Sequence, residues 1–149
     1  MKKLHLKKLP LILYIFSISA NTYAADWAIL DGNGKTSNLV EMDMSSIQQV
    51  ASIAKAWVKV TYPKPIEIIQ GSKDKYYSVM YRMMMDCKNG RYVFSTSILY
   101  SQPRGRGEVL GSTKLNEREA IYQMKDIAPD TVAGVILHYA CSPASTKPS

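Results

Sequence analysis

The chain has 149 residues, of which 46% are hydrophobic and 21% are charged, and its formal net charge is +7. This length fits one domain with a hydrophobic core of its own. Four lysines belong to a predicted export signal, so the mature charge is only +3, too small an excess to indicate a dedicated nucleic-acid-binding protein.

The first 24 residues have the pattern of a secretion signal. Lysines precede an apolar stretch over 11–20, and 22–24 form a small-x-small cleavage sequence. The apolar stretch is about half the ~20 residues of a spanning helix, so we expect no integral membrane segment after cleavage. We expect cleavage after Ala24 and export to the periplasm or the outer-membrane surface. No cysteine stands at the cleavage point, so we expect no lipid anchor through an N-terminal cysteine.

The first half of the mature chain is predicted to form strands. Apolar and alternating segments predict three of them, at 27–30, 39–42 and 54–62, the last ending at Pro63. The segment 47–54 is ambiguous, because its apolar residues also fall at helical spacing. The segment 63–72 contains two prolines and a glycine and is predicted to be a loop.

Asn89-Gly90 separates two alternating runs and predicts a β-hairpin. A two-residue turn pairs Lys88 with Arg91, and Cys87 then faces Tyr92. Further pairs follow the same register, and the apolar residues of both strands reach one side of the sheet. The other side is expected to face water or a partner, and it carries Ser78, Arg82, Asp86, Ser95 and Ser97.

A last strand at 108–112 and a C-terminal helix are expected after the hairpin. Pro129, Asp130 and Thr131 supply helix-start signals, and an apolar stripe predicts a helix that ends at Cys141. The domain is expected to cover 25–142. The polar tail at 143–149 is predicted to be disordered.

Cys87 and Cys141 are the only cysteines, and export would place them where disulfides persist. A thiolate metal site lacks further partners, since the mature chain has a single histidine, His138. A bridge would tie the end of the helix to the hairpin tip, so the helix must lie across the apolar side of the hairpin. The predicted fold class is α+β, an antiparallel β-sheet with one helix packed on one face and held by a disulfide.

No group of residues indicates an enzyme, a cofactor site or a metal site. His138 lies off the apolar stripe, so a surface histidine is favoured over a catalytic base. The carboxylates are dispersed, and no phosphate-binding glycine pattern is present. Asp86 is expected to have a capping or turn role.

Two features are candidates for binding a partner. The first is a basic rim for an acidic polymer or protein, formed by Arg104, Arg106, Lys73, Lys75 and Lys64, although turn geometry alone also explains the glycines of the arginine loop. The second is the set of ten tyrosines, which fits a sheet with partly exposed rings of the kind found at binding surfaces.

Several short motifs, in order and spacing, resemble those of the surface-adhesin protein E family. They lie between Trp27 and Cys141: Asp43-x-x-Ser46-Ile47, Trp57-Val58, Tyr62-x-Lys64-Pro65, Tyr77-Ser78-Val79, Asp86-Cys87, Tyr100-Ser101, Gly105-x-Gly107 and Ile127-x-Pro129. The resemblance implies about six antiparallel strands, a C-terminal helix held by the Cys87–Cys141 bridge, and a strand rather than a helix before Trp57.

The resemblance also implies a function in binding proteins. Members that gave the family its name bind host matrix and serum proteins such as vitronectin, laminin and plasminogen. We therefore expect an exported, non-enzymatic binding module for host proteins. The alternative is a periplasmic structural or assembly accessory that binds an envelope protein. Both a monomer and a homodimer remain open.

Overall fold

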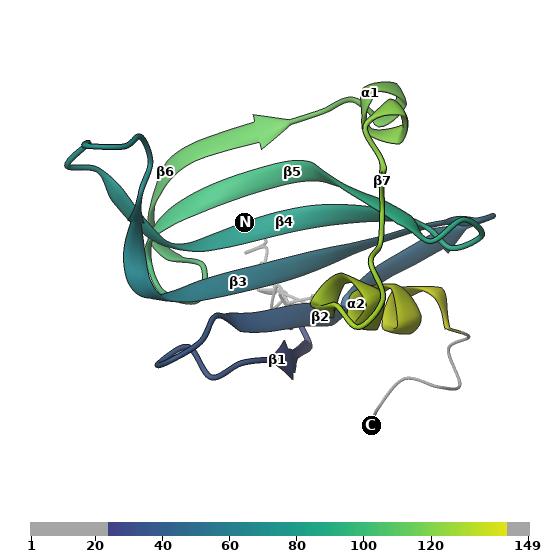
Figure 1. Ribbon diagram of the computed structural model, residues 1–149, viewed down its shortest axis with the longest axis horizontal. Coiled ribbons are helices and arrows are strands. Elements are labelled where there is room, and N and C mark those ends of the chain that lie inside the picture. The colour runs from purple at the N-terminus through teal and green to yellow at the C-terminus, as the bar shows by residue number, and fades with distance from the viewer. Residues whose placement is uncertain (1–23, 143–149) are drawn as a thin grey trace, which may run out of the picture.

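Six antiparallel strands follow one another in chain order across a single twisted, curved sheet (Figure 1). The structure, a computed structural model, describes residues 24–142, so most of the predicted signal and the predicted tail lie outside the described residues. The strands are β1 (Trp27–Asp31), β2 (Leu39–Val50), β3 (Ile53–Glu67), β4 (Lys75–Asp86), β5 (Arg91–Gln102) and β6 (Arg106–Lys114). The expected sheet of six antiparallel strands with a C-terminal helix is confirmed.

Two helices and a short seventh strand follow β6 in the chain. They are α1 (Glu117–Tyr122), β7 (Lys125–Asp126) and α2 (Val132–Cys141). β7 pairs with the first residues of β5. The sequence analysis predicted α2 but neither α1 nor β7. Of the two helices that the structure describes, neither has the length and apolarity needed to cross a membrane.

The helix α2 packs on one side of the sheet, which we call the α2 face. This face carries Met42, Ala56 and Met83, each fully buried, and they join Ile136 and Ala140 of α2 in one core. Thr131 begins the helix, because its side chain accepts a hydrogen bond from the backbone N–H of Gly134. Cys141 ends it and forms the expected disulfide with Cys87, with 5.7 Å between the Cα atoms.

The opposite side of the sheet, the α1 face, carries Asp43, Trp57 and Arg82 and has a smaller core of its own. Met84 and Val93 pack there against Ala120 of α1. Asn116 and Glu119 start α1 with a capping box, in which each side chain accepts from the other residue's backbone N–H. The expectation that this face is open to water or a partner is therefore wrong at Met84 and Val93, and also at Ser78, Asp86 and Ser95, which are buried.

The turn between β4 and β5 differs from the predicted two-residue turn. Strand pairing ends at Asp86 with Arg91, and Met85 faces Tyr92 rather than Phe94. The connection spans 87–90, with a hydrogen bond from Gly90 N to Asp86 O and a positive φ of 64° at Gly90 alone. A shift of two residues keeps each side chain on its face, so the predicted apolar side survives next to the turn.

Farther along β5, a β-bulge at Ser95 overturns the predicted faces. Phe94 pairs with Met83 and Thr96 pairs with Arg82, so Ser95 is the extra residue. Its hydroxyl donates to Arg82 O. Thr96, Ile98 and Tyr100 consequently lie on the α1 face, whereas Ser97 lies on the α2 face opposite Tyr81.

The structure assigns the ambiguous segment as the resemblance implied, and it corrects one predicted loop. The ambiguous segment 47–54 is not helical, because β2 continues to Val50 and turns at Ala51, where φ is 52°. The predicted loop at 63–72 is wrong in its first part, since β3 continues to Glu67. Pairing of β3 with β4 is interrupted between Thr61 and Ile66, so the intervening prolines need no ladder N–H.

Candidate binding surfaces

Five aromatic rings form one contacting pair and one contacting group of three, and the group of three lies on the α2 face beside the helix. Tyr76 meets Tyr62 edge to face at 5.7 Å between ring centroids. Tyr81 stacks on Phe94 at 4.1 Å, and Phe94 meets Tyr92 edge to face at 5.5 Å. The rings are partly exposed, Phe94 most of all at 39%. We call these five residues the aromatic band.

The band adjoins the first turns of α2. Tyr81, Tyr92 and Phe94 line a cavity of about 210 Å³ together with Val132 and Ile136 of the helix. Because the disulfide and the core hold α2 on the sheet, the band and the helix form one preformed surface.

The hydroxyls of Tyr62, Tyr76 and Tyr81 remain protonated at neutral pH. Burial, together with the neighbouring Tyr81, raises the pKa of Tyr62 above its ordinary value. Burial also raises the pKa of Tyr76 and that of Tyr81. These hydroxyls therefore supply hydrogen-bond donors and acceptors on an otherwise apolar surface.

The predicted basic rim falls into two groups at one end of the sheet. Arg104 and Arg106 belong to the β5–β6 turn. The three lysines lie where β3 connects to β4. Lys75 pairs with Glu67 at 3.7 Å. Arg106, Lys64 and Lys73 are exposed. Among residues 24–142, no hydrogen bond or ion pair joins the two groups into one site.

Arg104 holds the β5–β6 turn on the α1 face of the sheet. Its guanidinium donates to Oε1 of the buried Glu41 at 2.7 Å, and its backbone N–H donates to Thr61 Oγ1. Lys59 Nζ lies 3.5 Å from the other oxygen of Glu41 and 3.9 Å from the centroid of the Trp27 ring. The β5–β6 turn is thus folded back and fastened onto β2 and β3.

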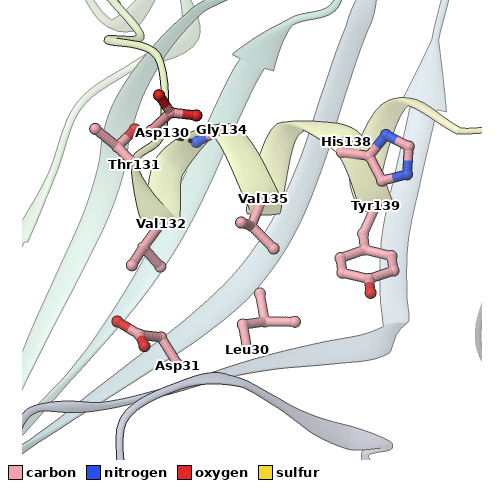
Figure 2. A pocket seen from close by; sticks show the side chains of 9 residues that line it. All are labelled: Leu30, Asp31, Asp130, Thr131, Val132, Gly134, Val135, His138 and Tyr139. Atoms are coloured by element: carbon pink, nitrogen blue, oxygen red, sulfur yellow. Dashed lines mark hydrogen bonds between the residues drawn. The ribbon is translucent and has the colours of Figure 1, made fainter.

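A broad groove of about 570 Å³ separates β1 from the exposed side of α2 (Figure 2). Val135 and Leu30 point toward each other across it, while Asp130 and His138 lie near opposite ends of the helix. His138 is exposed, as expected for a surface histidine. Among residues 24–142, no three histidine, cysteine, aspartate or glutamate side chains gather in a group suited to a metal ion.

The sequence predicted partly exposed tyrosines but not their arrangement in a band. Alternation correctly placed Tyr81, Tyr92 and Phe94 on one side of the hairpin. The stacking of Tyr81 on Phe94 was missed, because the predicted register put Ile98 opposite Tyr81. No local sequence signal locates Tyr62 beside them.

Comparison with known proteins identifies similar sequences and folds. The family model described as surface-adhesin protein E matches residues 27–142. Crystal form II of Haemophilus influenzae protein E is similar at a TM-score of 0.54 and 18% identity, covering 68% of this chain and 79% of that chain. Protein E from non-typeable Haemophilus influenzae is similar at 0.52 and 19%, covering 74% of each chain. At these identities the structural likeness concerns the fold alone. No curated protein matches this chain.

Proposed function

The chain belongs to the surface-adhesin protein E family, and on this premise we propose that it is an exported, non-enzymatic module that binds host matrix or serum proteins. The observation that carries the proposal is the aromatic band. Rings with an apolar body and a polar tip are enriched at the energetic centres of protein interfaces.

The setting of the band favours a protein ligand. Tyr81, Tyr92 and Phe94 contact one another, and the small cavity that they line beside α2 offers a recess for one side chain of a partner. Strand residues and a stapled helix hold the rings, so little conformational entropy is lost when the partner docks.

The basic rim has a secondary role in this proposal. Lys64, Lys73 and Arg106 are exposed and attract acidic regions of a partner over a distance of about one Debye length, ~8 Å at physiological salt. Arg104 and Lys75 contribute less, because each already pairs with a glutamate of this chain. We therefore propose that the rim speeds association with the partner and that the aromatic band provides most of the affinity.

Binding measurements with a matched pair of variants test the proposal. Phe94→Ser removes the most exposed ring of the band, whereas Val109→Ser removes a more exposed apolar side chain, 57% exposed, from β6. We expect Phe94→Ser to weaken binding to immobilised vitronectin, laminin or plasminogen at least tenfold and Val109→Ser to leave it unchanged. Equal binding by both variants, each with a wild-type melting curve, would contradict a role for the band.

Antibody labelling of intact cells tests the location. A host-binding module must be labelled without permeabilisation. If the mature protein is labelled only after permeabilisation, the host-binding proposal fails, and an envelope partner identified by cross-linking would replace it.

A further inference from the structure

A second groove lies on the α1 face, on the other side of the sheet from the aromatic band. It consists of two adjoining cavities of about 260 and 300 Å³ that share Gln48, Lys55, Met84 and Glu117. The first reaches Ile53 and the second reaches Trp57, so the groove follows β3. The end of β2 forms one wall, and α1 with the end of β6 forms the other.

The end of the groove at Ile53 is apolar. Val50, at the β2–β3 turn, is 78% exposed, and Ile121 of α1 on the facing wall is 46% exposed. Met84 is buried below them. An apolar side chain placed here would remove exposed hydrocarbon surface on both walls from water, which favours a complex.

The other end of the groove is cationic and aromatic. Trp57, Arg82, Thr96 and Lys114 pair in register on consecutive strands and form one row across β3 to β6. The Arg82 guanidinium lies 5.7 Å from the centroid of the Trp57 ring. The shorter of its two hydrogen bonds goes to a neutral partner, Gln48 Oε1, at 2.8 Å.

The positive charge at this end is incompletely neutralised. The ion pairs formed by the described residues include neither Arg82 nor Lys114. Arg82 is partly buried, and this burial lowers the pKa of its guanidinium, whereas the negative charge of Asp43 acts to raise it. An incoming carboxylate would therefore meet two cations, Arg82 and Lys114, and could accept charge-assisted hydrogen bonds from them.

Between the two ends, Lys55 of β3 and Glu117 of α1 form an ion pair. This pair neutralises itself, so the middle of the groove favours neither sign of charge in a ligand. It also connects α1 to β3 above the buried Met84.

The length of the groove sets the spacing of a ligand that fills both ends. Ile53 and Trp57 are four residues apart on β3, which corresponds to about 13 Å at ~3.3 Å per residue. Side chains on one face of an extended peptide recur every second residue, so the same distance separates positions i and i+4. We propose that this groove binds an extended segment of a partner protein with an apolar side chain at i and an acidic side chain at i+4. The residue at i+2 then lies over the Lys55–Glu117 pair.

Labelled synthetic peptides test the proposal without any natural ligand. The probe is a serine- and threonine-rich nonapeptide with one leucine and, four positions later, one glutamate. Two control peptides have the glutamate moved to two positions after the leucine, or replaced by glutamine. We expect the probe to bind at least fivefold more tightly than either control and to shift the backbone amide NMR signals of Lys55 and Thr96.

Variants of the protein identify the groove as the site. Lys114→Gln changes an exposed side chain that makes no ion pair among the described residues, and we expect it to weaken probe binding at least threefold. Arg82→Gln should weaken it at least fivefold, and Lys35→Gln, which changes an exposed lysine between β1 and β2, should have no effect. Equal binding of the three peptides, or signals that move only on the α2 face, would overturn the proposal. Binding of a sulfated oligosaccharide but not of the probe would overturn it in favour of an anion site. These measurements do not involve the aromatic band, so their outcome is independent of the proposed host binding.

Discussion

Asp86 closes the β4–β5 turn through contacts that require an ionised carboxylate. Its Oδ2 accepts from Asn89 Nδ2 at 2.7 Å and from Arg91 at 3.0 Å, and its Oδ1 accepts from the backbone N–H groups of Lys88 and Asn89. The hydrogen bond from the Asn89 side chain, followed by the one from Arg91, lowers the pKa of Asp86 to about 2. The expected turn role of Asp86 thus extends to the closure of a loop that contains a bridged cysteine.

This depressed pKa predicts acid sensitivity. The ordinary pKa of Asp86 is 3.8, so its stabilising contribution is complete above about pH 5 and is lost as the pH falls from about 4 to 2. The urea midpoint of the wild type should therefore fall over this range. We expect Asp86→Asn to have a lower midpoint at pH 6 and a flatter pH dependence. Parallel pH curves for the two proteins would argue against this role.

Arg104 fastens the β5–β6 turn, and its loss should be felt in stability. Arg104→Ala leaves the buried Glu41 with Lys59 as its remaining cation, and lost hydrogen bonds to charged groups cost about 1.5–3 kcal/mol. Because the Arg104 side chain is half exposed, solvent weakens the pair, and we expect the free energy of unfolding measured in urea to fall by about 1–2 kcal/mol. Arg106→Ala, in the same turn, serves as the control and should cost less than ~0.5 kcal/mol. An equal loss of unfolding free energy in both variants would show that the contact between Arg104 and Glu41 contributes little to stability.

At the scale of elements, the disulfide joins the end of α2 to the β4–β5 turn across 54 residues of sequence. Closing a loop of that length stabilises the folded state by up to about 4 kcal/mol on the chain-entropy model. We expect the double variant Cys87→Ala/Cys141→Ala to melt at a clearly lower temperature than the oxidised wild type. A reductant should bring the wild type to the same melting temperature as the variant. A melting curve insensitive to reductant would contradict the bridge's contribution.

The two helices should differ in local stability. α1 has six residues, one of them buried, whereas α2 has ten residues, two buried core contacts and the disulfide. Local opening needs less free energy where fewer apolar contacts must break. Native-state hydrogen exchange should therefore show protection in α1 at least tenfold lower than in α2. Equal protection would indicate that both helices open only with the whole sheet.

At the scale of the whole molecule, one sheet separates two surfaces. Rings beside α2 occupy one face, and a groove beside α1 occupies the other, each over its own core. The side chains of Phe94 and Lys114 lie on opposite faces of the sheet, so we expect the effects of changing them to be additive. The double variant Phe94→Ser/Lys114→Gln should lose host-protein binding by the same factor as Phe94→Ser, and probe binding by the same factor as Lys114→Gln. Losses in the double variant larger than these would reveal coupling through the sheet.

The sequence by itself determined the parts of this protein that depend on short-range patterns. Alternation identified the strands, Thr131 and the apolar stripe identified α2, and two cysteines in a chain with a predicted export signal identified the bridge. The capping box at Asn116 and Glu119 was present in the sequence and would have identified α1. These features are readable because neighbouring residues set them through backbone geometry and hydrogen bonding.

Only the tertiary structure decided which residues meet across strands. The Asp86 contacts lengthened the β4–β5 turn, and the bulge at Ser95 moved Thr96 to the α1 face, where it lies in one row with Arg82 and Lys114. Neither event has a signal in periodicity, because an alternating pattern fits several registers when both faces of a sheet carry apolar residues. The aromatic band and the groove depend on those registers, so they became visible only once the strands were paired.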